Sequence, residues 1–202
     1  HQEQTVTDLF QQSSHKLDGA ITEIQHCIAT GLANKQRLFE TMRQLYGEGS
    51  ANGAWSQRDA FDLLEAALTR HMAGLLSKPQ MLTQISETSA LIKALPTHTV
   101  RSEDQIRFQQ FSTPIPLGLV AAHAAAITPA DRVLEPSAGT GLLAILAEIA
   151  GGALVLNELA GTRANLLSRL FPAISVTRLD AAQIDDHLDP AVAPSIVLMN
   201  PP

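Results

Sequence analysis

Apolar side chains recur at helical spacing through the first 95 residues of the chain. Four such runs follow one another, at residues 5–28, 34–46, 56–75 and 81–95. Gly31 ends the first run, and Ser56 precedes the third as a residue type favoured at helix N-caps. The pattern predicts an all-helical N-terminal region over residues 1–95, with apolar faces packed as a bundle.

The pattern changes after a polar stretch at residues 96–110, which we interpret as a connector. Beyond it, short apolar runs alternate with helical patterns. The predicted strands are at residues 132–134, 153–156, 174–177 and 195–199, and the predicted helices at residues 117–127, 142–150 and 160–170. Strands alternating with helices are typical of a parallel, doubly wound sheet. We therefore expect an α/β domain of Rossmann-like fold over residues 111–202.

The charge balance argues against strong nucleic-acid binding by the chain alone. There are 14 Lys and Arg against 20 Asp and Glu, for a net charge of −6. Tight binding to phosphates requires clustered cations, so nucleic acid would have to be delivered by a partner domain. Cys27 is the single cysteine and excludes an intrachain disulfide. No apolar run approaches the roughly 18 residues of a membrane span, the start of the chain has no signal-peptide pattern, and the histidines lack metal-ligand spacing. We expect a cytoplasmic protein without a metal site.

The most informative motif lies where the first predicted strand ends. A carboxylate and a proline there precede two glycines that open a helical pattern, in the segment Glu135-Pro136-Ser137-Ala138-Gly139-Thr140-Gly141. Such glycines let a backbone approach a ligand closely. The glycines with Ala144 also fit the loose dinucleotide fingerprint, and an ordinary turn without a ligand is the plainest alternative. The acid favours S-adenosylmethionine, because a carboxylate repels a pyrophosphate and attracts an ammonium or sulfonium. The candidate cofactor-binding residues here are Glu135, Pro136, Ser137, Ala138, Gly139 and Gly141.

Two more acids follow the second and third predicted strands. Glu158 could accept hydrogen bonds from both ribose hydroxyls, although a helix N-terminus also favours an acid. Asp180, followed by Ala181, could accept from an adenine amino group, and the alternative role for Asp180 is a helix N-cap.

The fourth predicted strand ends in Asn200-Pro201-Pro202, our candidate catalytic residues. Consecutive prolines stiffen the loop. The Asn200 amide oxygen and a proline carbonyl could accept from one substrate amino group and draw its lone pair toward an incoming methyl. A plain Asn-Pro turn is the alternative.

An aromatic and hydroxyl pair precedes the first predicted strand. Phe111 and Thr113 could cover the methionine end of the cofactor. Thr113 could equally be an N-cap, with Pro114 at the first helical position.

Together these motifs resemble the amino-methyltransferases of the N6-adenine type, which have a seven-stranded Rossmann-like sheet and an Asn-Pro-Pro-aromatic catalytic loop. Segments 53–60, 108–114 and 180–186 are similar to the N-terminal methylase region of bacterial strawberry-notch-like proteins, which are methylase–helicase fusions. The resemblance covers roughly residues 30–202. It implies that the glycine segment holds the methionine moiety, Glu158 the ribose and Asp180 the adenine. It further implies that Asn200 and Pro201 orient the target amino group.

The same resemblance sets expectations for partners and activity. The family's aromatic residue would follow Pro202, where it stacks on an extruded base, and the C-terminal helicase domain is missing from this chain. We therefore expect little methyl transfer by the chain alone. We also expect self-association through the uncovered edge of strand 195–199.

Three functional hypotheses remain open. The first is an S-adenosylmethionine-dependent methyltransferase domain acting on adenine N6 in DNA. The second keeps the reaction and changes the target to protein glutamine or an RNA base. The third is a non-catalytic cofactor-sensing or docking module for an attached helicase.

Overall fold

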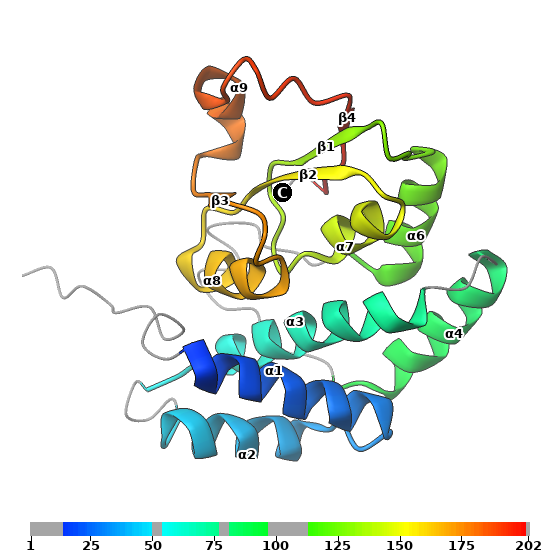
Figure 1. The fold of residues 1–202 in the computed structure, drawn as a ribbon. Coiled ribbons are helices and arrows are strands. Elements are labelled where there is room, and N and C mark those ends of the chain that lie inside the picture. Colours follow the sequence, from blue (N-terminus) through cyan, green and yellow to red (C-terminus); the bar gives the residue numbers. More distant parts are fainter. Residues whose placement is uncertain (1–13, 50–53, 77–80, 97–112, 201–202) are drawn as a thin grey trace, which may run out of the picture.

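A computed structural model describes residues 14–49, 54–76, 81–96 and 113–200 (Figure 1). Its N-terminal part contains four helices, α1 (Ser14–Ala29), α2 (Lys35–Tyr46), α3 (Gln57–Leu75) and α4 (Met81–Ala94). These match the four helical runs predicted from the sequence. The expected connector lies almost wholly outside the described residues, as do Phe111, Pro201 and Pro202.

Helix α3 is the centre of the helical region, and its start is fixed by a capping box. The Asp59 amide donates to Ser56 Oγ at 3.2 Å, and the Ser56 amide donates to Asp59 Oδ2 at 2.7 Å. The predicted Ser56 cap is thus confirmed. From this start α3 packs against α1 and α2 on one side and against helices of the α/β part on the other.

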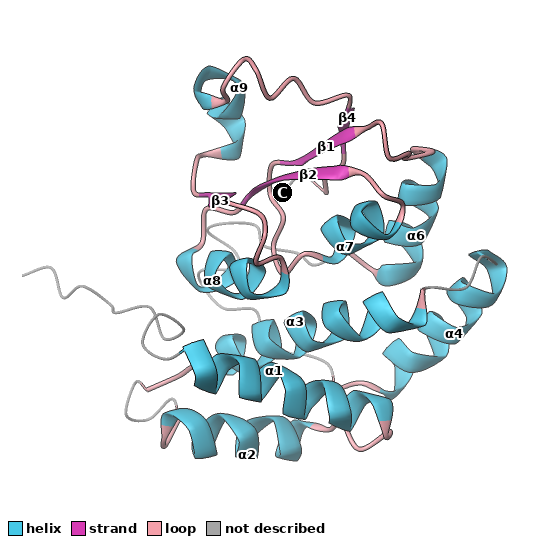
Figure 2. Cartoon of the chain, viewed as in Figure 1, coloured by secondary structure: helices cyan, strands magenta, loops and turns pink. Residues whose placement is uncertain are grey.

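The second part is an α/β unit with a parallel sheet, as predicted. Its elements in chain order are α6 (Ile115–Ala124), β1 (Arg132–Glu135), α7 (Leu142–Ile149), β2 (Ala153–Asn157), α8 (Gly161–Leu170), β3 (Val176–Thr177), η1 (Ala181–Gln183), α9 (Ile184–His187) and β4 (Ile196–Val197). The strand order is β3-β2-β1-β4, and all the pairings are parallel (Figure 2). This order is compatible with a Rossmann-like fold. From β1 the chain adds β2 and β3 on one side and then β4 on the other, so the strand order reverses between β1 and β4. Open α/β sheets bind ligands at such a position.

The two parts share one packed interior. Helices α6, α7 and α8 lie between the sheet and the helical region (Figure 1). Leu166 of α8 is fully buried in the apolar cluster of the helical region, and Met72 of α3 is fully buried in the cluster beneath the sheet. The helical region therefore forms a layer of the same body.

The outer strands are shorter than predicted. At the start of β3, the Ile174 amide donates to the Phe171 carbonyl at 3.0 Å, in the turn after α8, and not to β2. At β3, the Leu179 amide donates to Asn157 Oδ1 at 2.8 Å, where a ladder would have used a backbone carbonyl. At β4, backbone hydrogen bonds to β1 continue on both sides of the two-residue strand. The Ser195 amide donates to the Arg132 carbonyl and the Leu198 amide to the Leu134 carbonyl, both at 2.9 Å. Ser195 Oγ also donates to Asp131 Oδ1 at 2.8 Å, which ties the start of β4 to the start of β1.

Two local predictions differ from the structure. Helix α6 begins at Ile115 with Pro114 at its N-cap and has no side-chain cap, so Thr113 is not an N-cap. The short helices η1 and α9 were not predicted, since three- and four-residue helices carry no measurable periodicity. In the part of the chain that the structure describes, no helix has both the length and the apolarity to cross a bilayer.

Candidate functional site

The glycine segment forms a tight turn between β1 and α7. Gly139 and Gly141 have φ values of +56° and +86°, in the left-handed region that favours glycine. The Gly141 amide donates to the Ala138 carbonyl at 2.8 Å, and the Ala138 amide donates to the Asn157 carbonyl at 2.9 Å. The turn is therefore closed on itself and fastened to the end of β2.

Gly141 also allows close packing. A Cβ at this position would lie 2.6 Å from Phe171 Cε2 and 2.9 Å from Leu167 Cδ1. No side chain fits there without a shift of α8 or of the residue that follows it. The second glycine of the motif is thus explained by packing, and the first by the turn.

Glu135 is buried at the end of β1, with only 4% of its surface exposed. Its carboxylate accepts a hydrogen bond from the Ala144 backbone amide in the first turn of α7. Its Oε2 atom has no hydrogen-bond partner among the described residues. Burial raises the pKa of the Glu135 carboxyl well above its usual range, the Ala144 amide opposes this rise, and the nearby Glu158 adds to it.

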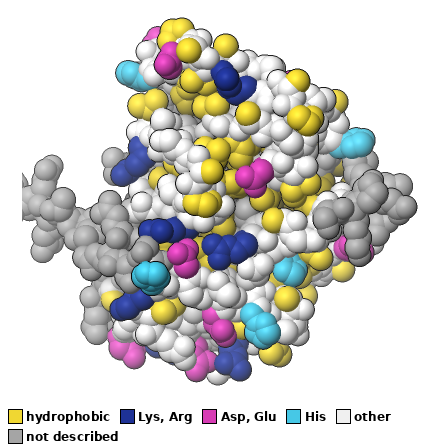
Figure 3. All heavy atoms as spheres, in the orientation of Figure 1, with side chains coloured by type: hydrophobic (Ala, Val, Ile, Leu, Met, Phe, Trp, Pro, Cys, Tyr) yellow, Lys and Arg dark blue, Asp and Glu magenta, His cyan; other side chains and the backbone are white. Residues whose placement is uncertain are grey.

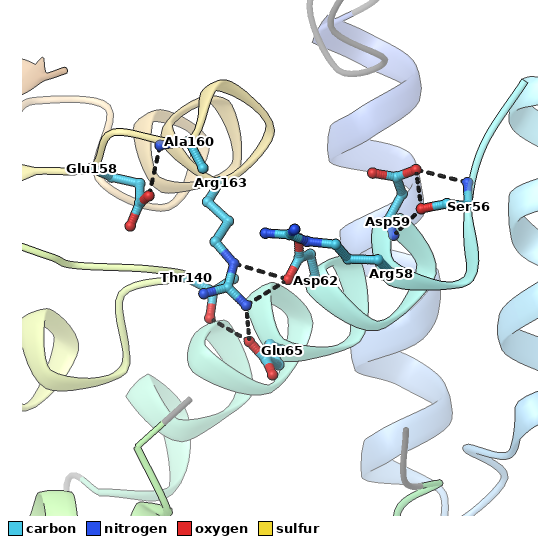
Figure 4. Close-up of polar contacts among 9 residues, drawn as sticks. All are labelled: Ser56, Arg58, Asp59, Asp62, Glu65, Thr140, Glu158, Ala160 and Arg163. Carbon is cyan, nitrogen blue, oxygen red and sulfur yellow. Dashed lines mark hydrogen bonds and ion pairs between the residues drawn. The ribbon is translucent and has the colours of Figure 1, made fainter. Parts of the chain in front are cut away.

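Glu158 is also buried and meets the glycine turn directly. Its Oε2 accepts from the Gly139 amide at 2.7 Å, and its Oε1 accepts from the Ala160 amide at 2.8 Å, just before α8 (Figure 4). Glu158, which follows β2, and Gly139, in the turn after β1, are two candidate cofactor residues that are thus brought into contact. Because a carboxylate oxygen has two acceptor sites, each oxygen can still accept a ligand hydroxyl.

The remaining candidates lie at the same edge of the sheet. Asp180 follows β3 and Asn200 follows β4, so both lie at the carboxyl edge with Glu135 and Glu158. Asp180 is exposed, and its Oδ1 accepts from the Ala182 amide at 3.0 Å, which is the N-cap role considered as its alternative. Asn200 is also exposed.

The residues flanking these candidates differ in exposure. Pro136 and Ala138 are buried, whereas Ser137, Ala181 and Thr113 are half-buried. No hydrogen bond of the described residues joins Thr113 to the glycine turn.

Asn157, which no sequence motif indicated, organises three strand ends. Its side chain is 1% exposed. Nδ2 donates to the Pro136 carbonyl at 2.8 Å and to the Leu179 carbonyl at 2.9 Å, while Oδ1 accepts from Thr177 Oγ1 at 2.7 Å. Together with the Leu179 amide, this uses every donor and acceptor of the amide group. The sequence signal for this role was a polar amide side chain directly after the apolar run of β2 and directly before Glu158.

A second missed group connects the glycine turn to α3. Arg163 Nε and Nη2 both donate to Asp62 Oδ1, at 3.0 and 2.9 Å, and Arg163 Nη2 lies 3.8 Å from Glu65 Oε2 (Figure 4). Thr140 Oγ1 donates to the same Glu65 oxygen at 3.2 Å. Burial opposes the charged guanidinium, but Asp62 and Glu65 outweigh it and raise the pKa of Arg163.

The edge therefore presents two buried acids, a glycine turn and a single organised strand-end network. Within the described residues, no group of His, Cys, Asp and Glu side chains could hold a metal ion. Comparison of the chain with protein-family models, with curated proteins and with solved structures found no match.

Proposed function

We propose that this chain is an S-adenosylmethionine-binding methyltransferase domain. Support comes from the meeting of Glu135, Glu158 and the glycine turn at the carboxyl ends of β1 and β2. This position borders the point where the strand order reverses, between β1 and β4.

The observation that carries the proposal is the unpartnered Oε2 of Glu135. A buried carboxylate oxygen without a donor is unfavourable unless a ligand or a proton satisfies it. A dinucleotide would bring a pyrophosphate toward two buried acids, which is electrostatically repulsive. S-adenosylmethionine brings an ammonium and a sulfonium, so the acids become favourable once it binds.

The residues of the chain would divide the work of binding. Glu135 and the turn at Gly139 would hold the methionine end, and Glu158 would hold the ribose through its remaining acceptor sites. Asp180 would contact the adenine, for which its Oδ2 is the relevant atom because Oδ1 caps Ala182. When bound, the cofactor supplies an electrophilic methyl group. The chain would contribute by orienting the target amino group through Asn200 and Pro201.

The proposed target is adenine N6 in DNA, which the Asn-Pro-Pro motif supports by resemblance. A protein amide target is the second candidate. The net charge of −6 favours it, as does the surface in Figure 3, where basic side chains are dispersed among acidic ones. Because we expect little transfer by this chain alone, a longer chain that includes the rest of the sheet is incubated with a tritiated donor and separate DNA, RNA and protein pools to distinguish these targets. Loss of transfer in Asn200→Ala would tie any signal to the proposed loop. In that longer chain, donor binding without transfer to any pool would favour the docking-module alternative.

Isothermal titration calorimetry with S-adenosylmethionine and S-adenosylhomocysteine tests the cofactor. We expect binding by the native chain and a loss of at least about tenfold in affinity for Glu135→Ala and Glu158→Ala. Glu148→Ala is the matched control, because Glu148 is an exposed acid on α7. Binding of a nicotinamide dinucleotide in preference to the methyl donor would contradict the proposal, as would equal losses for all three variants.

A further inference from the structure

The glycine turn is flanked, on the side opposite the sheet, by Glu65 of helix α3 and by Arg163 of helix α8. Thr140 donates to Glu65 at 3.2 Å, and Arg163 Nη1 lies 3.7 Å from the position that a Cβ on Gly139 would occupy. Arg163 in turn is fixed by Asp62 (Figure 4). Two consecutive residues of the turn are therefore flanked by one ionic cluster, and Glu158 holds the Gly139 amide from β2.

The Asp62–Arg163 ion pair has a high desolvation cost if its only role is to hold α3 against α8. The side chains of Asp62 and Arg163 are 3% and 5% exposed, so both charges have lost their water. Buried ion pairs of this kind often stabilise a fold no better than apolar residues of the same volume. The α3–α8 contact already has apolar residues for that purpose, including the fully buried Leu166. Apolar residues cannot accept a hydrogen bond from the Thr140 hydroxyl, and so they cannot fix the orientation of the turn.

We propose that Arg163 and Glu65 are positioning residues for the cofactor turn, which makes α3 of the helical region a structural part of the methyl-donor site. This inference rests on the proposed function for the identity of the ligand. The cluster fixes Thr140 by a hydrogen bond and lies against Gly139 before the ligand arrives, so less ordering is needed on binding. Helix α3 is then required for affinity through its effect on the turn.

Amide hydrogen exchange on the full chain tests the positioning without any ligand. Glu65→Ala removes the carboxylate that accepts the Thr140 hydrogen bond. Because the Glu65 side chain is one-third exposed, the variant is expected to fold. We expect faster exchange at residues 138–141 in Glu65→Ala and Arg163→Lys, with α2 unchanged. Glu65→Gln keeps an acceptor oxygen and should restore protection. Leu166→Ala is the matched control, because it weakens the same α3–α8 contact without touching the cluster.

Calorimetry with S-adenosylhomocysteine then tests the consequence for binding. We expect an affinity loss of about tenfold or more for Glu65→Ala and Arg163→Lys, with recovery in Glu65→Gln and no loss in folded Leu166→Ala. Unchanged exchange at the turn in Glu65→Ala, with native affinity, would overturn the positioning role. Equal affinity losses in Leu166→Ala and Arg163→Lys would also overturn it. If the native chain binds neither S-adenosylmethionine nor S-adenosylhomocysteine, the proposed function is wrong, and so is the cofactor role of the cluster. The exchange data then show separately whether Arg163 orders the turn.

Discussion

Replacing Glu135 by glutamine should make the protein more stable at neutral pH and remove a pH dependence of its unfolding. Glutamine has the same shape and keeps an oxygen for the Ala144 amide, but it cannot ionise. In the native protein the pKa of Glu135 is raised by burial and by Glu158, whereas in the unfolded chain it is near the ordinary value of about 4.3. Between these two pKa values the folded state binds one more proton than the unfolded state, so raising the pH favours unfolding.

The size of the pH effect on the free energy of unfolding follows from the difference of one bound proton between the folded and unfolded states. The free energy of unfolding of the native protein should fall relative to Glu135→Gln by about 1.4 kcal/mol for each pH unit within that window. Below about pH 4 both states are protonated, and the two proteins should differ by a constant amount. Urea denaturation at half-unit steps from pH 4 to 8 measures the difference, and other titrating groups cancel in the comparison. Parallel stability curves for the two proteins would refute the reasoning.

The same group should couple cofactor binding to pH. A cationic ligand beside Glu135 lowers its pKa, so binding releases a proton and weakens as the pH falls toward the ordinary range of a carboxyl group. Calorimetry with S-adenosylmethionine in buffers of different ionisation heat measures that proton. Glu135→Gln should release none, and equal proton release by both proteins would contradict the assignment of the acid.

Two substitutions probe the architecture of the turn. Gly141→Ala should lose roughly 2–5 kcal/mol of unfolding free energy, because its Cβ would lie 2.6 Å from Phe171 at a φ of +86°. The matched Gly19→Ala, in helix α1 with open space around its Cβ, should gain up to about 1 kcal/mol in the same urea denaturation; similar values for the two would contradict the packing argument. Asn157→Asp should lose roughly 2–5 kcal/mol, and more at pH 8 than at pH 5, since it places an acid oxygen 2.8 Å from the Pro136 carbonyl. Thermal unfolding at both pH values measures this loss, and a change within about 0.5 kcal/mol would show that the amide network is dispensable.

Local signals in the sequence were sufficient for the longer helices, for β1 and β2, and for the edge of the sheet that carries the candidate site. Ser56 and the helical period defined α3, and acids after successive apolar runs predicted Glu135 and Glu158 at neighbouring strand ends. These features depend on residues close together in the chain. Parallel strands then bring their carboxyl ends to one edge without further information.

The polar contacts around the turn could not be predicted in this way. Asp62 and Arg163 are 101 positions apart, and each occurs in a helix whose apolar pattern is satisfied without it. Asn157 follows the predicted strand at residues 153–156 and had no predicted role, although its side chain replaces part of the β2–β3 ladder. Thr113 was considered as a cap because of its residue type, but the proline that follows it occupies the cap position. In each case the deciding partner is set by tertiary packing.

The separation of Asp62 from Arg163 also has a consequence for the order of folding. Closing a loop of 101 positions costs more chain entropy than forming the hydrogen bonds of α1, α7 and β1–β2, which join residues much closer in the sequence. Helical signal should therefore recover early during refolding, and competence to bind ligand should lag behind it until α3 docks on α8.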